Sequence, residues 1–370
     1  MQFIFFVNIL RILFPTFIIF CIFFNQHSFA TGLQKSILPV PRPIFFESFK
    51  PKLFETILNE KKLEADIGFI LYDIEDSKIL EAINPSKQYP LASITKLVTA
   101  LYAMEILGSG HVFTTTIEAI GEESGGILDG NLILRGGSDP TLSNDDLVIL
   151  VDNLWDNGLR KVGGKFIVDS SDAIYHGEID SDQPEYLSYN PSISGLNLNF
   201  NRVLFEWETV NGLYSFKFQA RSAINNFDVS TTDVNFSKSK HKFKDNNYNG
   251  KNDTWFFDHS FLEKAKKRWL PVRNPDNYAA ELFWIIADKK VIELPKPEIR
   301  HYPTKGKVLA KAESEPLFNN IQLMLKYSNN LLSEIVGLSA TKKFSGDKKE
   351  IKASANIMGS WLENKIGNYQ

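Results

Sequence analysis

A serine and a lysine lie three residues apart in the stretch "YPLASITKLVTALYAMEILG" (89–108), at Ser93 and Lys96. Apolar residues recur at helical spacing after Ser93, which predicts a helix that ends at Gly108. Residues i and i+3 of a helix lie on one face, so the hydroxyl and the amine are expected to meet. A lysine that is removed from water loses its proton more easily and can then act as the base for a serine nucleophile.

The same two residues also have a purely structural interpretation. Ser93 would then cap the helix, and Lys96 would extend its amine to the solvent. The Ser-x-x-Lys pattern is weak by itself, because it occurs five times, beginning at Ser93, Ser237, Ser239, Ser339 and Ser345. Only Ser93 opens a strongly apolar helix behind a predicted pair of strands. On the local sequence both interpretations stay open.

A second polar cluster interrupts an apolar helical region near the end of the chain. Ser-x-Asn occurs at Ser188, Ser328 and Ser354, and the one in "YSNN" breaks the helical pattern of residues 316–344. A turn between packed helices can direct a hydroxyl and an amide into a cleft. Ser328 would then transfer a proton, and Asn330 would hold a substrate amide. The alternative is an ordinary polar turn between two helices.

Composition excludes several classes of function. The chain has 370 residues, 43% hydrophobic and 23% charged, with a formal net charge of -3, so no basic field predicts nucleic acid as a partner. The basic run at 237–244 is interpreted as a solvated loop. The sequence contains no G-x-S-x-G, HExxH or phosphate-binding glycine motif.

The first thirty residues are almost continuously apolar, with one positive residue, Arg11. Small residues at Ser28 and Ala30 predict a signal peptide over 1–30 that is cleaved after Ala30. The rest of the chain is therefore expected to be exported to the periplasm, with membrane contact only through an uncleaved leader. Cys21, the only cysteine, lies in this leader, so the mature part has no disulfide, thiol nucleophile or zinc-cysteine site.

The order of elements predicts an α+β protein. Residues 66–74 are apolar on both faces, as in a central strand, and 78–83 is the expected antiparallel partner. Helices are predicted over 144–162 and 274–290, and β-structure from about 195 to 260. The chain thus alternates helical and β-rich regions, which predicts at least one inserted domain.

Five segments in order resemble a known family. They are "LASITKLVTAL", "RGGSDPTL", "SGLNLNFNRV", "LPVRNPDNYAAELF" and "KYSNNLLSEIVG". Together they are similar to the penicillin-binding D-alanyl-D-alanine carboxypeptidase/endopeptidases of low-molecular-mass class C, over about residues 45 to 340. Each segment alone is weakly specific, but the ordered series is highly specific.

The resemblance implies a serine-type hydrolase. Ser93 would be the acylated nucleophile, Lys96 its general base, and Ser328 with Asn330 the second catalytic element. The substrates would be peptidoglycan stem peptides and cross-bridges, cut through an acyl-enzyme, and β-lactams would acylate the same serine. Neither a metal nor an organic cofactor is implied.

The resemblance also implies an architecture. We expect a penicillin-binding, transpeptidase-like fold, an antiparallel sheet with helices. Its first part would span 31–110, inserted β-rich domains 111–300, and the return to the first domain 301–370.

The third element of the family, Lys-Thr-Gly on a strand edge after Ser-x-Asn, does not occur in this sequence. "TKGK" at 304–307 precedes the second element. The sequence therefore resembles the N-terminal three-quarters of the family, without the last strands of the sheet. Loss of one oxyanion N–H costs on the order of 3 kcal/mol of transition-state stabilisation. A non-catalytic peptidoglycan-binding or scaffold homologue is the alternative function, and a β-lactamase is a third.

Overall fold

A computed structural model describes residues 54–61, 65–236, 253–260, 262 and 266–367. The chain forms two compact units, Met1–Pro90 and Leu91–Gln370, which are described separately. The predicted signal peptide and the basic loop at 237–244 lie outside the described residues. Among the helices that are described, none combines the length and the apolar character needed to cross a bilayer.

The described part of the first unit contains helix α2 (Phe54–Lys61) and a hairpin of β1 (Phe69–Asp73) and β2 (Lys78–Ile83). The predicted antiparallel pairing is confirmed. Among the described residues β1 pairs with β2 alone, in a two-stranded sheet, and a second neighbouring strand, as in a central strand, stays a prediction. Apolar residues on both faces indicate how a strand is covered above and below, and they carry no information on how many strands flank it.

The second unit is built on a mixed six-stranded sheet. Its order is β13 (Pro297–Ile299), β6 (Phe166–Asp169), β4 (Ile127–Arg135), β3 (Thr114–Ser124) and β14 (Lys307–Glu313), with β5 (Lys161–Val162) also paired to β4. The three strands β4, β3 and β14 pair antiparallel, whereas β6 pairs parallel to both β4 and β13. Because β14 pairs with β3, this sheet continues past residue 300, and the predicted boundaries of the inserted domains stay predictions.

Two amphipathic helices pack with this sheet, α4 (Asn144–Asp156) and α6 (Pro275–Lys289). Both were predicted from sequence. The first begins at a reciprocal cap, in which the Ser143 backbone N–H donates to the Asp146 carboxylate at 2.8 Å. The second begins at Pro275, whose missing N–H costs nothing in the first turn. Their leucines and aromatic residues join the strands in one core.

A second sheet is antiparallel, in the order β12 (Lys267–Pro271), β7 (Arg202–Val210), β8 (Leu213–Arg221) and β9 (Asn226–Asp228). The β7–β8 hairpin turns at Asn211 and Gly212, with φ of 53° and 80°, the left-handed conformation that two-residue hairpins prefer. A separate parallel pair consists of β10 (Thr232–Phe236) and β11 (Asp253–Phe257). These strands confirm the β-structure predicted for this region.

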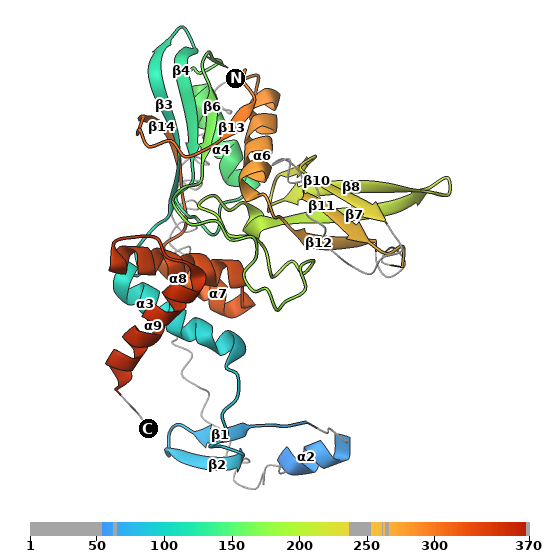
Figure 1. Cartoon of the computed structure of the whole chain (residues 1–370), viewed down its shortest axis with the longest axis vertical. Coiled ribbons are helices and arrows are strands. Elements are labelled where there is room, and N and C mark those ends of the chain that lie inside the picture. The colour runs from blue at the N-terminus through green and yellow to red at the C-terminus, as the bar shows by residue number, and fades with distance from the viewer. Residues whose placement is uncertain (1–53, 62–64, 237–252, 261, 263–265, 368–370) are drawn as a thin grey trace, which may run out of the picture. The chain divides into compact units, whose positions relative to one another are not determined.

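Four helices form the layer that carries the site: α3 (Lys96–Leu107), α7 (Leu317–Tyr327), α8 (Asn330–Ser345) and α9 (Ile351–Ile366). Figure 1 shows them gathered on one side of the two sheets of the second unit. The fully buried Tyr102 of α3 contacts Trp361 of α9 edge to face, with ring centroids 5.3 Å apart. Helix α9 was not predicted, although Ile357 and Trp361 are four residues apart, as on one helical face.

The turn "RGGS" after β4 packs too closely for side chains at its two glycines. A Cβ on Gly137 would lie 2.1 Å from the Thr114 carbonyl oxygen, and one on Gly136 would lie 2.3 Å from the Gly195 carbonyl oxygen. This approach brings the start of β3 and the segment around Gly195 to the end of β4.

We predict that Gly137→Ala lowers the free energy of unfolding by about 1–3 kcal/mol, because the methyl group must displace backbone atoms. Gly110→Ala is the control, since a Cβ there has no neighbour within 4 Å. Chemical denaturation monitored by circular dichroism measures both variants. Equal stability of the two would contradict the close packing.

Candidate active site

Ser93 lies in a single turn of 3-10 helix, η2 (Ala92–Thr95), directly before α3. The sequence analysis predicted a helix that opens at Ser93, and the α-helical geometry in fact begins at Lys96. Ala92 has a φ of 46°, a conformation that is uncommon for residues other than glycine. Such backbone conformations cluster at functional sites, where the surrounding structure maintains them.

Lys96 points inward rather than to the solvent. The residue is 8% exposed, and its Nζ donates to Ser93 Oγ at 3.1 Å and to Asn330 Oδ1 at 2.8 Å. The hydroxyl of Ser93 is in contact with this amine and does not cap the helix. The structural interpretation, with a serine cap and an outward lysine, is therefore wrong.

Burial controls the charge of this lysine. Removal from water lowers the pKa of Lys96 below its ordinary value, and the carboxyl group of Glu334 acts in the opposite direction. Burial likewise raises the pKa of Glu334, against the influence of Lys96. Both shifts favour the uncharged forms, because desolvation is the larger cause for each group. A neutral Lys96 is the form that can accept a proton.

Ser328 lies at the break between α7 and α8. Its φ and ψ of 53° and 38° place it in the left-handed region that ends α7, and its hydroxyl donates to Ser93 Oγ at 2.8 Å. The next residue, Asn329, caps α8 by accepting the Leu332 N–H at 3.0 Å. This tight turn directs the Ser328 hydroxyl toward Ser93.

Asn330, the first residue of α8, completes the cluster. Its Oδ1 accepts from Lys96, and its Nδ2 donates to the backbone carbonyl of Tyr189 at 3.1 Å. The structure therefore brings all four predicted site residues together from two segments more than 230 positions apart in the sequence. Their catalytic and binding roles stay predictions.

A cavity of about 380 Å³ adjoins Ser328 and Asn330. Arg202 lines it, with its guanidinium carbon 5.3 Å from the ring centroid of Phe200 and 5.2 Å from that of Trp269. Its Nε is buried and has no hydrogen-bond partner in the part of the chain that the structure describes. The cavity thus has both a guanidinium group and the Ser328 hydroxyl among its lining residues.

Sequence reasoning missed Glu334, Tyr189 and Arg202. Glu334 had a signal, since a residue four positions after Asn330 lies on the same face of the helix. Tyr189 contributes a backbone carbonyl, for which its residue type carries no information. Arg202 lies in the segment "SGLNLNFNRV", where no local pattern indicates that its side chain lines a cavity.

The cluster can perform nucleophilic catalysis. One hydroxyl oxygen, Ser93 Oγ, contacts both a buried amine that can take its proton and a second hydroxyl that can pass a proton onward. Within the described residues, no three His, Cys, Asp or Glu side chains are grouped so that they could hold a metal ion.

The chain is similar to known proteins of one family. Residues 51–364 match the D-Ala-D-Ala carboxypeptidase 3 (S13) family. The D-alanyl-D-alanine carboxypeptidase DacB of Haemophilus influenzae is 27% identical over 286 residues, which cover 73% of this chain and 58% of the relative. A D-alanyl-D-alanine carboxypeptidase of an Actinomadura species is 30% identical over 151 residues, covering 39% of this chain and 27% of the relative.

Solved structures match as well. Penicillin-binding protein 4 of H. influenzae superposes with a TM-score of 0.67 at 23% identity, covering 85% of this chain and 71% of that chain. The same protein in complex with a β-lactam gives 0.63 at 21% identity, with coverages of 84% and 69%. These matches confirm the α+β, penicillin-binding fold that the sequence predicted.

The chain belongs to the D-Ala-D-Ala carboxypeptidase 3 (S13) family. The family that the sequence motifs predicted is thereby confirmed. The chain spans 58% of the length of its curated H. influenzae relative.

The contact between Ser93 and Lys96 can be tested without any assay of activity. We predict that the thiol introduced by Ser93→Cys has a pKa below the usual value of about 8.5, because the Lys96 N–H group that donates to residue 93 stabilises the thiolate. The rate of iodoacetamide alkylation as a function of pH measures this pKa. Ser109→Cys, at an exposed position just after α3, is the control. The same pKa at both positions would mean that Lys96 does not contact residue 93 in solution.

Proposed function

We propose that this protein is a serine-type D-Ala-D-Ala carboxypeptidase/endopeptidase that acts on peptidoglycan stem peptides and cross-bridges. The observation that carries this proposal is the buried Lys96 amine, 3.1 Å from Ser93 Oγ, in a chain of this family. A serine with a desolvated amine as its neighbour is the minimal apparatus for acyl transfer.

The proposed reaction has two stages. Neutral Lys96 accepts the Ser93 proton while Oγ attacks the carbonyl carbon of the D-alanyl residue before the scissile bond. Collapse of the tetrahedral intermediate breaks the C–N bond, and the proton passes from Lys96 to the leaving amine, directly or through Ser328. Water then hydrolyses the ester and restores Ser93.

The other residues position these groups. Asn330 holds the Lys96 amine toward Ser93 through its Oδ1 and is proposed to hold a substrate amide in the complex. The cavity beside it, which Arg202 lines, favours a peptide that carries a carboxylate. Stem peptides supply such groups.

β-Lactams are proposed as covalent inhibitors that acylate Ser93. The β-lactam complex of the H. influenzae penicillin-binding protein, which shares this fold, supports this proposal. The proposed location is the periplasm, after cleavage of a signal peptide behind Ala30. Its support is the apolar sequence of the first thirty residues.

We predict that a fluorescent penicillin labels the chain covalently, and that Ser93→Ala abolishes the labelling. Ser345→Ala is the matched control, because Ser345 opens another Ser-x-x-Lys pattern at the far end of α8 and retains normal labelling. Gel fluorescence followed by mass spectrometry of the labelled peptide measures the outcome. Labelling that survives in Ser93→Ala would remove Ser93 from the mechanism.

The non-catalytic alternative gives a different result. Under this alternative the protein binds peptidoglycan or acts as a scaffold without forming an acyl-enzyme. It requires that the wild-type chain sediment with purified peptidoglycan and take up no penicillin even after prolonged incubation. That pair of results would replace the hydrolase proposal with a wall-binding function.

The pH dependence of acylation tests the charge state of Lys96. Because only the neutral amine accepts a proton, the acylation rate is lost as the pH falls through the pKa of Lys96. We predict an inflection below the ordinary lysine value of about 10.4, since burial lowers this pKa. Lys96→Arg slows acylation by about 10²–10⁴-fold, because arginine keeps its proton.

Glu334→Gln adds a directional control to the same experiment. Removal of the carboxyl group that raises the pKa of Lys96 moves the inflection to lower pH. Stopped-flow or gel-based acylation rates at a series of pH values measure the shift. An inflection that moves upward or stays in place would contradict the proposed electrostatic contact.

A further inference from the structure

Arg273 is a buried arginine in the segment "LPVRNPDNYAAELF", between β12 and α6, and it is only 6% exposed. Its backbone is held on both sides. The Arg273 N–H donates to Asp253 Oδ2 at 2.6 Å, and the Arg273 carbonyl accepts from the Tyr175 hydroxyl at 2.8 Å. The guanidinium group therefore extends from a fixed point of the backbone.

This guanidinium binds three backbone carbonyls of one loop, residues 170–192, which follows β6. Nη1 donates to the carbonyls of Gly177 and Asn190, the latter at 2.9 Å, and Nη2 donates to the carbonyl of Glu185 at 2.6 Å. The fixed fork of N–H donors in a guanidinium suits such a set of acceptors, whereas a lysine has a single nitrogen. One side chain thus joins distant parts of the loop.

The side chain of Asn190 closes the same loop from within. It is 1% exposed, and its Oδ1 accepts from the N–H groups of Ile179 and Asp180, both at 2.9 Å. Its Nδ2 donates to the Asp180 carbonyl at 2.8 Å. Residues 177–190 are therefore one hydrogen-bonded unit with two centres, the Arg273 guanidinium and the Asn190 amide.

Tyr189 is the residue by which this unit contacts the candidate active site. Its carbonyl accepts from Asn330 Nδ2 at 3.1 Å, while Asn330 Oδ1 accepts from the Lys96 amine at 2.8 Å. Only Nδ2 of an asparagine can donate, so the Tyr189 carbonyl fixes which end of the Asn330 amide faces Lys96. Tyr189 precedes Asn190 in the chain, so the contact that holds the Asn190 carbonyl also restricts the Tyr189 carbonyl.

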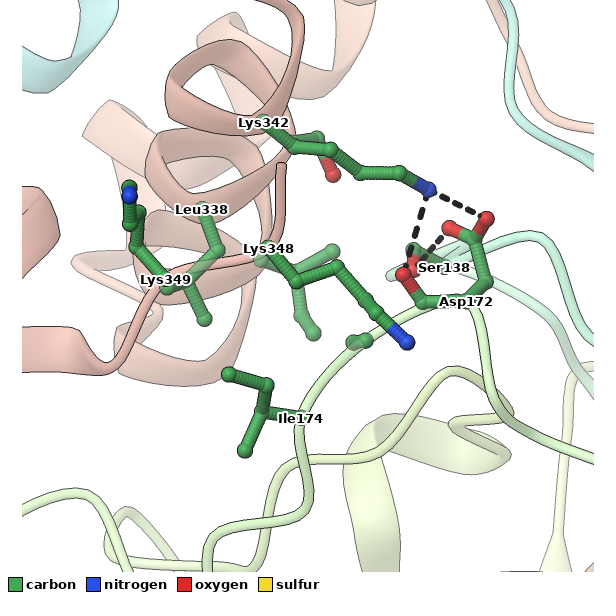
Figure 2. A pocket seen from close by; sticks show the side chains of 10 residues that line it. Ser138, Asp172, Ile174, Leu338, Lys342, Lys348 and Lys349 are labelled. Carbon is green, nitrogen blue, oxygen red and sulfur yellow. Dashed lines mark hydrogen bonds and ion pairs between the residues drawn. The ribbon is translucent and has the colours of Figure 1, made fainter. Parts of the chain in front are cut away.

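The beginning of the loop has a separate attachment at the other end of α8. Lys342 Nζ donates to Asp172 Oδ1 at 2.5 Å, and Ser138 Oγ donates to Asp172 Oδ2 at 2.6 Å. Figure 2 shows these three side chains converging. Lys342 follows Asn330 by twelve positions, which is about 18 Å along a helix. This contact holds the same loop without reaching the site, so it offers a matched control.

We propose that Arg273 is a positioning residue of the active site, which acts through Tyr189 on Asn330. It holds the Tyr189 carbonyl where that carbonyl fixes the Asn330 amide. Asn330 in turn holds the Lys96 amine toward Ser93. The role of Arg273 in the reaction rests on the proposed function, whereas this series of contacts exists without substrate.

The thiol of Ser93→Cys measures the contact between Lys96 and residue 93 without any acyl transfer. In this background Arg273→Lys keeps the charge, but its single nitrogen cannot reach three carbonyls. We expect the thiol pKa, from iodoacetamide alkylation rates against pH, to rise by about half a unit to one unit, because the lysine amine is held less well. Lys342→Gln, which even removes a charge, is expected to leave this pKa unchanged.

Acylation tests the consequence for the reaction. With Ser93 in place, Arg273→Lys is expected to slow acylation by a fluorescent penicillin by about tenfold to a hundredfold, because small displacements of catalytic groups are costly. Lys342→Gln is expected to react at the wild-type rate. A wild-type chain that takes up no penicillin would count against the proposed hydrolase function alone, because the thiol pKa still decides the role of Arg273.

Two results would overturn the positioning role. One is an unchanged thiol pKa in Arg273→Lys, and the other is an equal rise in Arg273→Lys and Lys342→Gln. Melting temperatures show whether the variants are folded. If Arg273→Lys does not fold, Asn190→Ala replaces it, since it removes the other centre of the loop and is expected to raise the thiol pKa in the same direction. A folded Asn190→Ala with an unchanged thiol pKa would equally contradict the proposal.

Discussion

The burial of the Lys96 amine is the constraint on which the site depends. An ammonium group out of water is costly unless it is hydrogen-bonded or gives up its proton, and here its two partners are Ser93 Oγ and Asn330 Oδ1. Those contacts join the start of α3 to the start of α8. The same desolvation that penalises the charged lysine lowers its pKa and so favours the neutral amine that a serine nucleophile needs.

The geometry of the site depends on backbone conformation as well as on side-chain chemistry. Ala92 and Ser328, on either side of the nucleophile, both have positive φ, at 46° and 53°. Each costs conformational free energy that the packed helices around it must supply. The cluster of Tyr102, Leu332 and Val336 provides that packing, because it buries α3 against α8 directly behind the polar groups. The apolar core thus maintains a polar arrangement that would not persist in an isolated helix.

The segment that leads into β7 also helps to form this site. The segment from Tyr189 to Arg202 leads into β7 and lines the cavity beside Ser328. Asn330 is oriented partly by the Tyr189 carbonyl, so the loop before β7 positions a residue at the start of α8.

The sequence by itself determined several of the helices and strands and the candidate groups of the site. Helical periodicity located α4, α6 and α7, and the ordered motifs identified the family together with Ser93, Lys96, Ser328 and Asn330, because these signals are local in the chain. Only the tertiary structure decided that Lys96 turns inward, that Glu334 acts on it, and that Arg202 lines the cavity. These features depend on contacts between residues up to 234 positions apart, and no local pattern encodes which face of a helix another segment will cover.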